Sequence, residues 1–147
     1  MIYYIPFLLQ GVAFLFDEFY FHYRRNLPLW ERIGHPLDTL SVLVCYLWIL
    51  MHEYNDFNLR VYIGLAVFSS VLVTKDEFVH SQQCEPSENW LHSVLFILHP
   101  VTFLSAGIMW IHGVDQSFLI GQSVLVGLFT VYQILYWSPL WKKTTLK

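Results

Sequence analysis

The sequence predicts an all-α integral membrane protein, a bundle of five transmembrane helices. The 147 residues are 56% hydrophobic and only 13% charged, whereas about a quarter of the residues of a soluble domain are charged. Several stretches approach the roughly 20 apolar residues that a spanning helix needs. Histidines and acids also gather near the ends of these stretches instead of being spread along the chain. The length suits a single membrane domain, 1–147.

Five apolar segments are expected to cross the membrane. They cover about 2–23, 36–52, 61–80, 90–112 and 118–141. The connections between them are short, so consecutive helices are expected to pack as antiparallel neighbours. The first segment is too long, and its end too acidic, for a cleaved signal peptide.

Positive charges predict the orientation of these segments. Arg24, Arg25 and Arg32 share the first connection. Lys75 lies toward the third connection, and the other lysines are near the C-terminus, so with five spans all of them fall on one side. Only Arg60 lies on the other side. Because Lys and Arg favour the cytoplasmic side, we expect the N-terminus outside and the C-terminus in the cytoplasm. No basic cluster suggests nucleic acid as a partner.

A weak internal repeat places similar polar residues in both halves of the chain. "DEFYFH" at Asp17–His22 leads to "ERIGHPLD", and "KDEFVH" at Lys75–His80 leads to "ENWLH". Each unit would be a helical hairpin with the same orientation, as in parallel repeats of membrane proteins. Both sets of polar residues are therefore expected to converge near the cytoplasmic face.

Helical spacing predicts that these polar residues form a metal site. Residues three or four apart share a helix face, as do Glu18 and His22. The five carboxylates near this face would together cost on the order of 10 kcal/mol at membrane depth, and bound cations would offset this. Histidine and carboxylate ligands suit iron, zinc or manganese. We predict two divalent ions, with iron favoured. The predicted ligands are Glu18, His22, His35, Asp38, Glu77, His80, His92 and His99.

Other acids near this face are assigned more ordinary roles. Glu31 and Glu88 are interpreted as solvated connection residues. Asp17 and Asp76 are expected to orient ligand histidines or to form caps and ion pairs, with Lys75 as the expected partner of Asp76.

The motif Glu77-Phe78-Val79-His80 resembles the Glu-x-x-His motif of ferritin-like di-iron carboxylate bundles. Membrane fatty-acid desaturases and hydroxylases share the plan of two irons near the cytoplasmic face. Their HxxxH and HxxHH boxes are not present here. The resemblance implies a di-iron oxidoreductase with Glu18 and Glu77 as catalytic carboxylates.

Three functions follow from these observations. The preferred one is oxygen-dependent hydroxylation or desaturation of a lipid or acyl chain, with membrane lipids as surroundings and a cytoplasmic electron donor as partner. The second is a zinc-dependent lipid hydrolase, with three protein ligands and a water on the metal. The third is non-enzymatic binding or transport of metal ions or protons, because intramembrane carboxylates and histidines also mark ion pathways.

Overall fold

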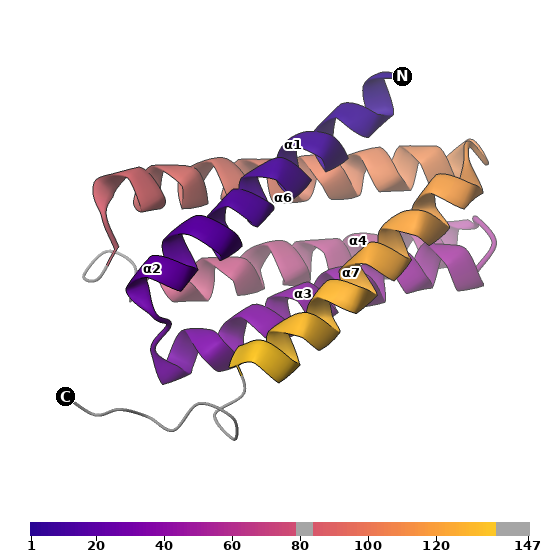
Figure 1. Ribbon diagram of the computed structural model, residues 1–147. Coiled ribbons are helices and arrows are strands. Elements are labelled where there is room, and N and C mark those ends of the chain that lie inside the picture. The colour runs from indigo at the N-terminus through magenta and orange to yellow at the C-terminus, as the bar shows by residue number, and fades with distance from the viewer. Residues whose placement is uncertain (79–83, 138–147) are drawn as a thin grey trace.

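The computed structural model describes residues 1–78 and 84–137. Within these residues, all regular elements are helical, and five helices are long and apolar enough to span a membrane (Figure 1). The expected all-α class is confirmed.

The first spanning helix changes its winding before it ends. It runs from Ile2 to Arg25 without a break. Its parts are η1 (Ile2–Tyr4), α1 (Ile5–Phe16), the π-helical segment η2 (Asp17–His22) and α2 (Tyr23–Arg25). The helix stops at Asn26, which has a φ of 62°. Asparagine adopts this left-handed region more readily than most other side chains.

Helix α3 (Leu29–Met51) begins earlier than the second predicted span. Pro28 is its N-cap residue in an extended conformation, and Pro36 lies inside the helix rather than at its start. Residues that were expected in a connection therefore belong to a helix. As a result, Glu31 and His35 lie one turn apart on the same face.

The remaining helices also have identifiable starts. In α4 (Asp56–Leu72), the Asn55 side chain accepts a hydrogen bond from the backbone N–H of Asn58 at 2.8 Å, a typical N-cap. A 3₁₀ turn, η3 (Val73–Asp76), follows α4. Helix α6 (Pro86–Ile111) opens on a proline, and α7 (Gln116–Trp137) ends the described chain.

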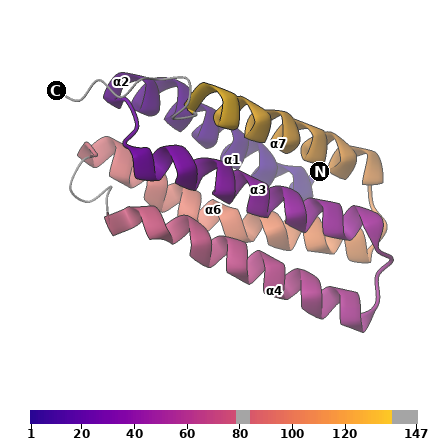
Figure 2. The same ribbon diagram turned by 90° about the horizontal axis from the view of Figure 1, so that it is seen from below.

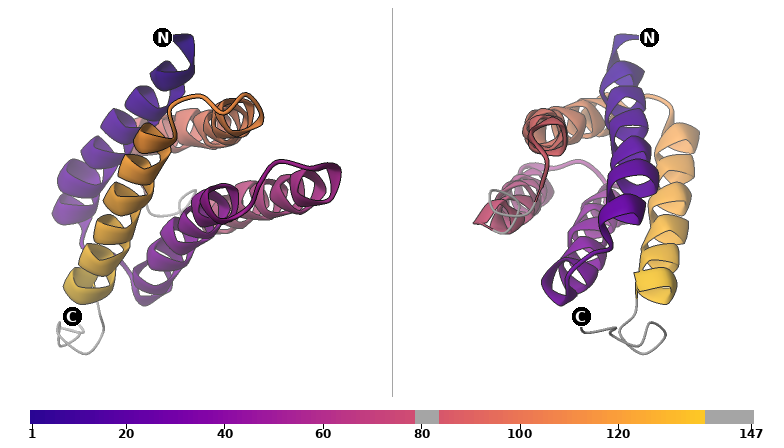
Figure 3. Two further views of the ribbon diagram at one scale, coloured as in Figure 1. Left: turned by 90° about the vertical axis from the view of Figure 1, so that its right-hand side faces the viewer. Right: turned by 60° about the vertical axis from the view of Figure 1, so that its left-hand side comes forward.

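The order of packing differs from the order along the chain. Helix α1 packs mainly against α6, whereas α3 packs against α7 and α4 (Figure 2). The expectation that consecutive helices are neighbours is met by α3 and α4 but not by α1 and α3. The view in Figure 3 shows α1 and α7 running alongside each other across the other helices. Side chains from α1, α3, α6 and α7 consequently surround a shared interior.

The bundle is apolar outside and has two different regions inside. Large side chains such as Leu8 and Leu128 are more than 60% exposed, as expected for helix faces covered by lipid. Toward the end that holds the α3–α4 connection, the core is hydrophobic and includes Phe7, Tyr46 and Met109. Toward the opposite end, where α2 turns into α3 (Figure 1), acids and histidines are buried together with a few hydrophobic side chains such as Leu27 and Trp137. This polar end contains the candidate site.

Candidate metal centre and the cavity beside it

Acidic, histidine and arginine side chains from three parts of the chain meet at the polar end of the bundle. They come from the end of the first spanning helix, from the first turns of α3 and from the first turns of α6. The acids and histidines are all at most 9% exposed. We call this group the buried cluster. Its members are Asp17, Glu18, His22, Arg25, Glu31, His35, Glu88 and His92.

The π-helical segment explains how one helix contributes three members. A π turn is wider than an α turn and brings residues i and i+5 together, which places Asp17 beside His22. His22 Nε2 lies 3.1 Å from Asp17 Oδ2, and His22 Nδ1 lies 3.4 Å from Glu18 Oε2. Single π turns inside α-helices are frequent at functional sites. The local winding thus turns two acids and a histidine inward.

Helices α3 and α6 complete the cluster with one acid and one histidine each. In α6, His92 Nε2 lies 3.0 Å from Asp17 Oδ1. In α3, His35 Nε2 lies 3.8 Å from Glu31 Oε2. The ring of His22 is central, with its centroid 4.6 Å from that of His35 and 6.3 Å from that of His92.

This geometry could hold metal. Asp17, His22, Glu88 and His92 each offer a ligand atom, and these atoms lie within 4.8 Å of one another. A second group with the same property consists of His22, Glu31 and His35. Two ligand atoms of a tetrahedral zinc ion, at about 2.0–2.2 Å from it, are about 3.4 Å apart. Small side-chain adjustments would therefore close either group around an ion.

One arginine neutralises part of the cluster's charge. Arg25 donates to both carboxylate oxygens of Glu31, at 3.0 and 2.6 Å, and to Glu88 Oε1 at 3.2 and 3.0 Å. The four carboxylates of the cluster and this guanidinium leave a net charge of −3 when the histidines are neutral. Such a charge inside a protein requires protons on the histidines or bound cations.

Cys84 lies just before α6 and faces this arginine–carboxylate arrangement. Burial raises the pKa of its thiol, and nearby Glu88 adds to the rise while Arg25 opposes it. The thiol is therefore neutral at physiological pH. Cys84 belongs to neither group of possible ligands, so the donors of those two groups are carboxylate oxygens and imidazole nitrogens.

Helix α7 supplies no acid or histidine within its described residues but holds Glu18 in place. The indole N–H of Trp137 donates to Glu18 Oε1 at 2.6 Å. Gln133 Nε2 lies 3.4 Å from Glu18 Oε2, and the Gln133 carbonyl accepts a hydrogen bond from Thr39 at 2.7 Å. Glu18 is thus oriented by hydrogen-bond donors from a helix that contributes no ligand itself.

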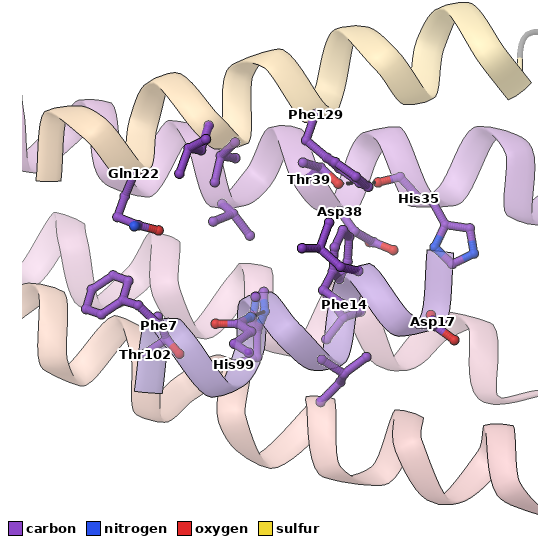
Figure 4. A pocket seen from close by; sticks show the side chains of 18 of the residues that line it. Phe7, Phe14, Asp17, His35, Asp38, Thr39, His99, Thr102, Gln122 and Phe129 are labelled. Atoms are coloured by element: carbon purple, nitrogen blue, oxygen red, sulfur yellow. Dashed lines mark hydrogen bonds between the residues drawn. The ribbon is translucent and has the colours of Figure 1, made fainter. Parts of the chain in front are cut away.

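A cavity of about 310 Å³ extends from the buried cluster into the bundle. Asp17, His35 and His92 form part of one end of its wall, and Figure 4 shows the first two at that end. Apolar side chains such as Phe14 and Phe129 line its middle. From residue 7 to residue 17 on the first helix the cavity is about 15 Å long at 1.5 Å per residue. This volume is at the lower limit of small-molecule sites.

The structure brings together half of the ligands that were predicted from the sequence. Glu18, His22, His35 and His92 all belong to the buried cluster. His80 lies outside the described residues.

The other three predicted ligands lie elsewhere. Both carboxylate oxygens of Asp38 accept from Lys75 Nζ at 2.7 Å, so the lysine pairs with this acid. His99 is in the cavity wall, two turns from the cluster, where it contacts other polar side chains. Glu77, proposed as a catalytic carboxylate, is exposed because it follows a 3₁₀ turn at the end of α4, and it belongs to neither group of possible ligands.

Three acids take places in the cluster that the sequence interpretation did not give them. Glu31 and Glu88 were assigned to solvated connections, yet they are 0% and 2% exposed. Asp17 was expected to orient ligand histidines, and its carboxylate does contact His22 and His92, but it is also in a group of possible ligands itself. A signal for the first two exists, since Glu31-x-x-x-His35 and Glu88-x-x-x-His92 share one spacing and lie at the starts of α3 and α6.

Comparisons of the chain with family models, with curated proteins and with solved structures found no match.

Proposed function

We propose that this protein is a membrane-embedded two-metal oxidoreductase that hydroxylates or desaturates a lipophilic substrate with dioxygen. The observation that carries the proposal is the juxtaposition of a buried carboxylate–histidine cluster with a largely apolar cavity. A site for metal and a site for an apolar molecule share the wall that includes Asp17, His35 and His92.

The two groups of ligand atoms suggest two ion positions. Asp17, Glu88 and His92 would hold one ion, Glu31 and His35 would hold the other, and His22 lies between them. Two divalent ions together carry a charge of +4. They would change the net charge of the cluster from −3 to +1, which is smaller in magnitude. Iron is the metal we favour, because its oxidation state can change during the reaction, and manganese and zinc bind the same donors.

The reaction needs a reductant from outside the protein. In hydroxylation, one atom of dioxygen enters a C–H bond and the other leaves as water, which consumes two electrons and two protons. In desaturation, two C–H bonds are broken and a C=C bond forms, and dioxygen takes up these two hydrogens with two further electrons and two protons to leave as two molecules of water. A one-electron carrier protein would deliver the electrons. Bound iron would supply the site of dioxygen reduction, and the chain would orient the substrate and exclude water.

We place this site near the cytoplasmic face. Arg24, Arg25 and Arg32 lie at the same end of the bundle as the buried cluster, and Lys75 at the end of α4 lies there too. This distribution follows the rule that basic residues stay on the cytoplasmic side. A soluble electron carrier would then reach the cluster without crossing the membrane.

The test measures oxidised lipid made by purified protein in nanodiscs. We expect iron-loaded protein with a chemical reductant and ¹⁸O₂ to give lipids that contain ¹⁸O or have lost two hydrogens. His92→Ala should abolish this product. His112→Ala, an exposed histidine at the opposite end of the bundle, should leave it unchanged. Iron-loaded protein that gives no oxygen-dependent product, or protein that is active with zinc alone, would refute the proposal.

One group of ligands also favours a second candidate, a zinc-dependent lipid hydrolase. Asp17, His22 and His92 would supply three ligands and leave a fourth position for water, as in catalytic zinc sites, with Glu88 as the neighbouring base. Zinc-loaded protein would then cleave an ester or amide bond of a lipid without dioxygen or reductant. The second ligand group would have no role in this reaction, so His35→Ala would leave it intact.

A further inference from the structure

The end of the cavity that lies away from the buried cluster carries four polar side chains among apolar ones such as Phe7. Gln10, His99, Thr102 and Gln122 all belong to its wall. Figure 4 shows the last three at the end opposite Asp17 and His35. Polar side chains in the middle of a membrane are unfavourable and are associated with function.

In two of these four residues, both ring nitrogens of His99 and the hydroxyl proton of Thr102 are already engaged. Gln10 Nε2 lies 3.1 Å from His99 Nδ1, and Ser69 Oγ lies 3.0 Å from His99 Nε2. Both ring nitrogens of His99 are thus engaged, which fixes the ring. Thr102 donates to the backbone carbonyl of Leu98 at 2.9 Å.

The two glutamines retain hydrogen-bonding groups that face the cavity. Among the described residues, Gln122 has no hydrogen-bond partner for its amide N–H groups or its carbonyl oxygen. The carbonyl oxygen of Gln10 likewise has none there. An alkyl chain packed against them would leave these groups unsatisfied, at about 1–3 kcal/mol each. The cavity therefore favours an occupant that offers both a donor and acceptors.

We infer that the cavity binds an elongated lipophilic molecule carrying a hydroxyl group, which Gln10 and Gln122 recognise at the polar end. A hydroxyl donates one hydrogen bond and accepts two, so it can satisfy an amide N–H and a carbonyl together. A carbonyl group only accepts and would leave the glutamine oxygens unsatisfied. The apolar body of the ligand lies against Phe14 and Phe129.

The length of the cavity sets the number of bonds between this hydroxyl and the carbon that reacts at the buried cluster. This step rests on the proposed function. His92 at the cluster and His99 at the polar end are seven residues apart on α6, about 10 Å at 1.5 Å per residue. An extended chain advances roughly 1.2 Å per bond, so roughly eight bonds separate the two ends. The substrate class is a long-chain alcohol that is oxidised about eight bonds from its hydroxyl carbon.

Photolabelling of the purified full-length chain in detergent tests the inference. The probes are a ten-carbon primary alcohol, the matching alkane and the matching ketone, each carrying the same diazirine. Labelled cavity residues are identified by mass spectrometry, in metal-free and in iron-loaded protein. We expect the alcohol to label the cavity at least fivefold more than the alkane or the ketone in both forms.

Two pairs of variants make the test specific. Gln122→Leu should reduce labelling by the alcohol to the level of the alkane, whereas Gln116→Leu, the same change at an exposed position on α7, should have no effect. Gly11 belongs to the cavity wall, and a Cβ there would meet no atom within 4 Å, so there is room for a larger side chain. Gly11→Leu should therefore abolish labelling by all probes, and Gly121→Leu, also unobstructed but outside the cavity wall, should not.

Each outcome decides the inference separately from the proposed function. Equal labelling by alcohol and alkane, a preference that survives Gln122→Leu, or a preference for the ketone would overturn the hydroxyl assignment. Selective alcohol labelling without oxygen-dependent oxidation of that alcohol would refute the oxidoreductase but leave the binding site in place. Oxidation of lipids without selective labelling would refute the hydroxyl-binding site but leave the proposed oxidoreductase function in place.

Discussion

Replacing Arg25 with glutamine tests whether the buried cluster is held together by charge. Arg25 contacts both oxygens of Glu31 and one oxygen of Glu88, and these two acids are essentially inaccessible. The variant would leave two buried carboxylates without their cation. Removing one partner of a buried ion pair destabilises a protein by about 3–5 kcal/mol. We expect a loss of this size in metal-free Arg25→Gln.

Metal should reverse the loss, because divalent ions would neutralise the same two acids. A ligand that binds only the folded state stabilises it by about 2.7 kcal/mol at 100 times its Kd and by about 4.1 kcal/mol at 1,000 times. Saturating Fe²⁺ or Zn²⁺ should therefore restore most of the stability of Arg25→Gln. The variant should also bind the ion more tightly than the wild type, because a competing cation has been removed.

The assay is equilibrium unfolding in mixed detergent micelles, with and without added metal. Arg24→Gln is the matched control. Arg24 is the neighbouring residue, and its exposed guanidinium donates to the hydroxyl of Tyr20 at 2.7 Å. We expect the control to lose less than about 1 kcal/mol, as for other surface interactions. The reasoning fails if metal-free Arg25→Gln is as stable as Arg24→Gln, or if metal does not restore it.

Three further predictions concern residues around the site and in the core. Trp137→Phe removes the 2.6 Å hydrogen bond to the Glu18 carboxylate and should lower the free energy of unfolding by about 1.5–3 kcal/mol; an unchanged unfolding curve would show that this bond is not formed. Burial raises the pKa of Cys84. In a variant whose other cysteine is replaced by alanine, alkylation of Cys84 by iodoacetamide should therefore stay slow up to pH 8.5 in the folded protein and become fast on unfolding. Equal alkylation rates in the folded and unfolded protein would contradict the burial. A Cβ at Gly107 would lie 3.0 Å from a tyrosine ring of α4, so Gly107→Ala should destabilise by about 1–3 kcal/mol, whereas Gly64→Ala, which meets nothing within 4 Å, should be neutral or stabilising in the same unfolding assay.

The five spanning helices could be predicted because composition and hydropathy determine them. A chain with so few charges cannot leave its apolar segments in water, and the segment lengths match a membrane. The convergence of polar residues at one end also followed, because short connections bring alternate helix ends together. Glu18, His22, His35 and His92 were found in this way.

The ligands that were missed depend on local winding and on where the helices begin, which the hydropathy of the sequence does not define. No residue pattern announces the π turn that aligns Asp17 with His22. The prolines at 28 and 36 suggested a connection, although a membrane helix can accommodate an internal proline. Glu31 was therefore assigned to solvent, and its burial depends on an arginine that folds back from the preceding helix.

Asp38 and His99 were assigned to the metal site because the sequence does not show their three-dimensional surroundings. The sequence shows that Asp38 is acidic and near the right depth, but not that Lys75 from α4 reaches it. His99 shares a helix face with His92, yet two turns place it at the other end of the cavity. Their different depths along α6 make His92 a possible metal ligand and His99 a residue of the cavity wall.

The amount of metal bound per chain tests the central claim most directly. Elemental analysis of detergent-purified protein should find two divalent ions per chain in the wild type and a loss of at least one in His92→Ala. His99→Ala should retain both ions, because that histidine lies in the cavity wall but outside both ligand groups. Wild-type protein without stoichiometric metal, or equal losses in His92→Ala and His99→Ala, would contradict the account.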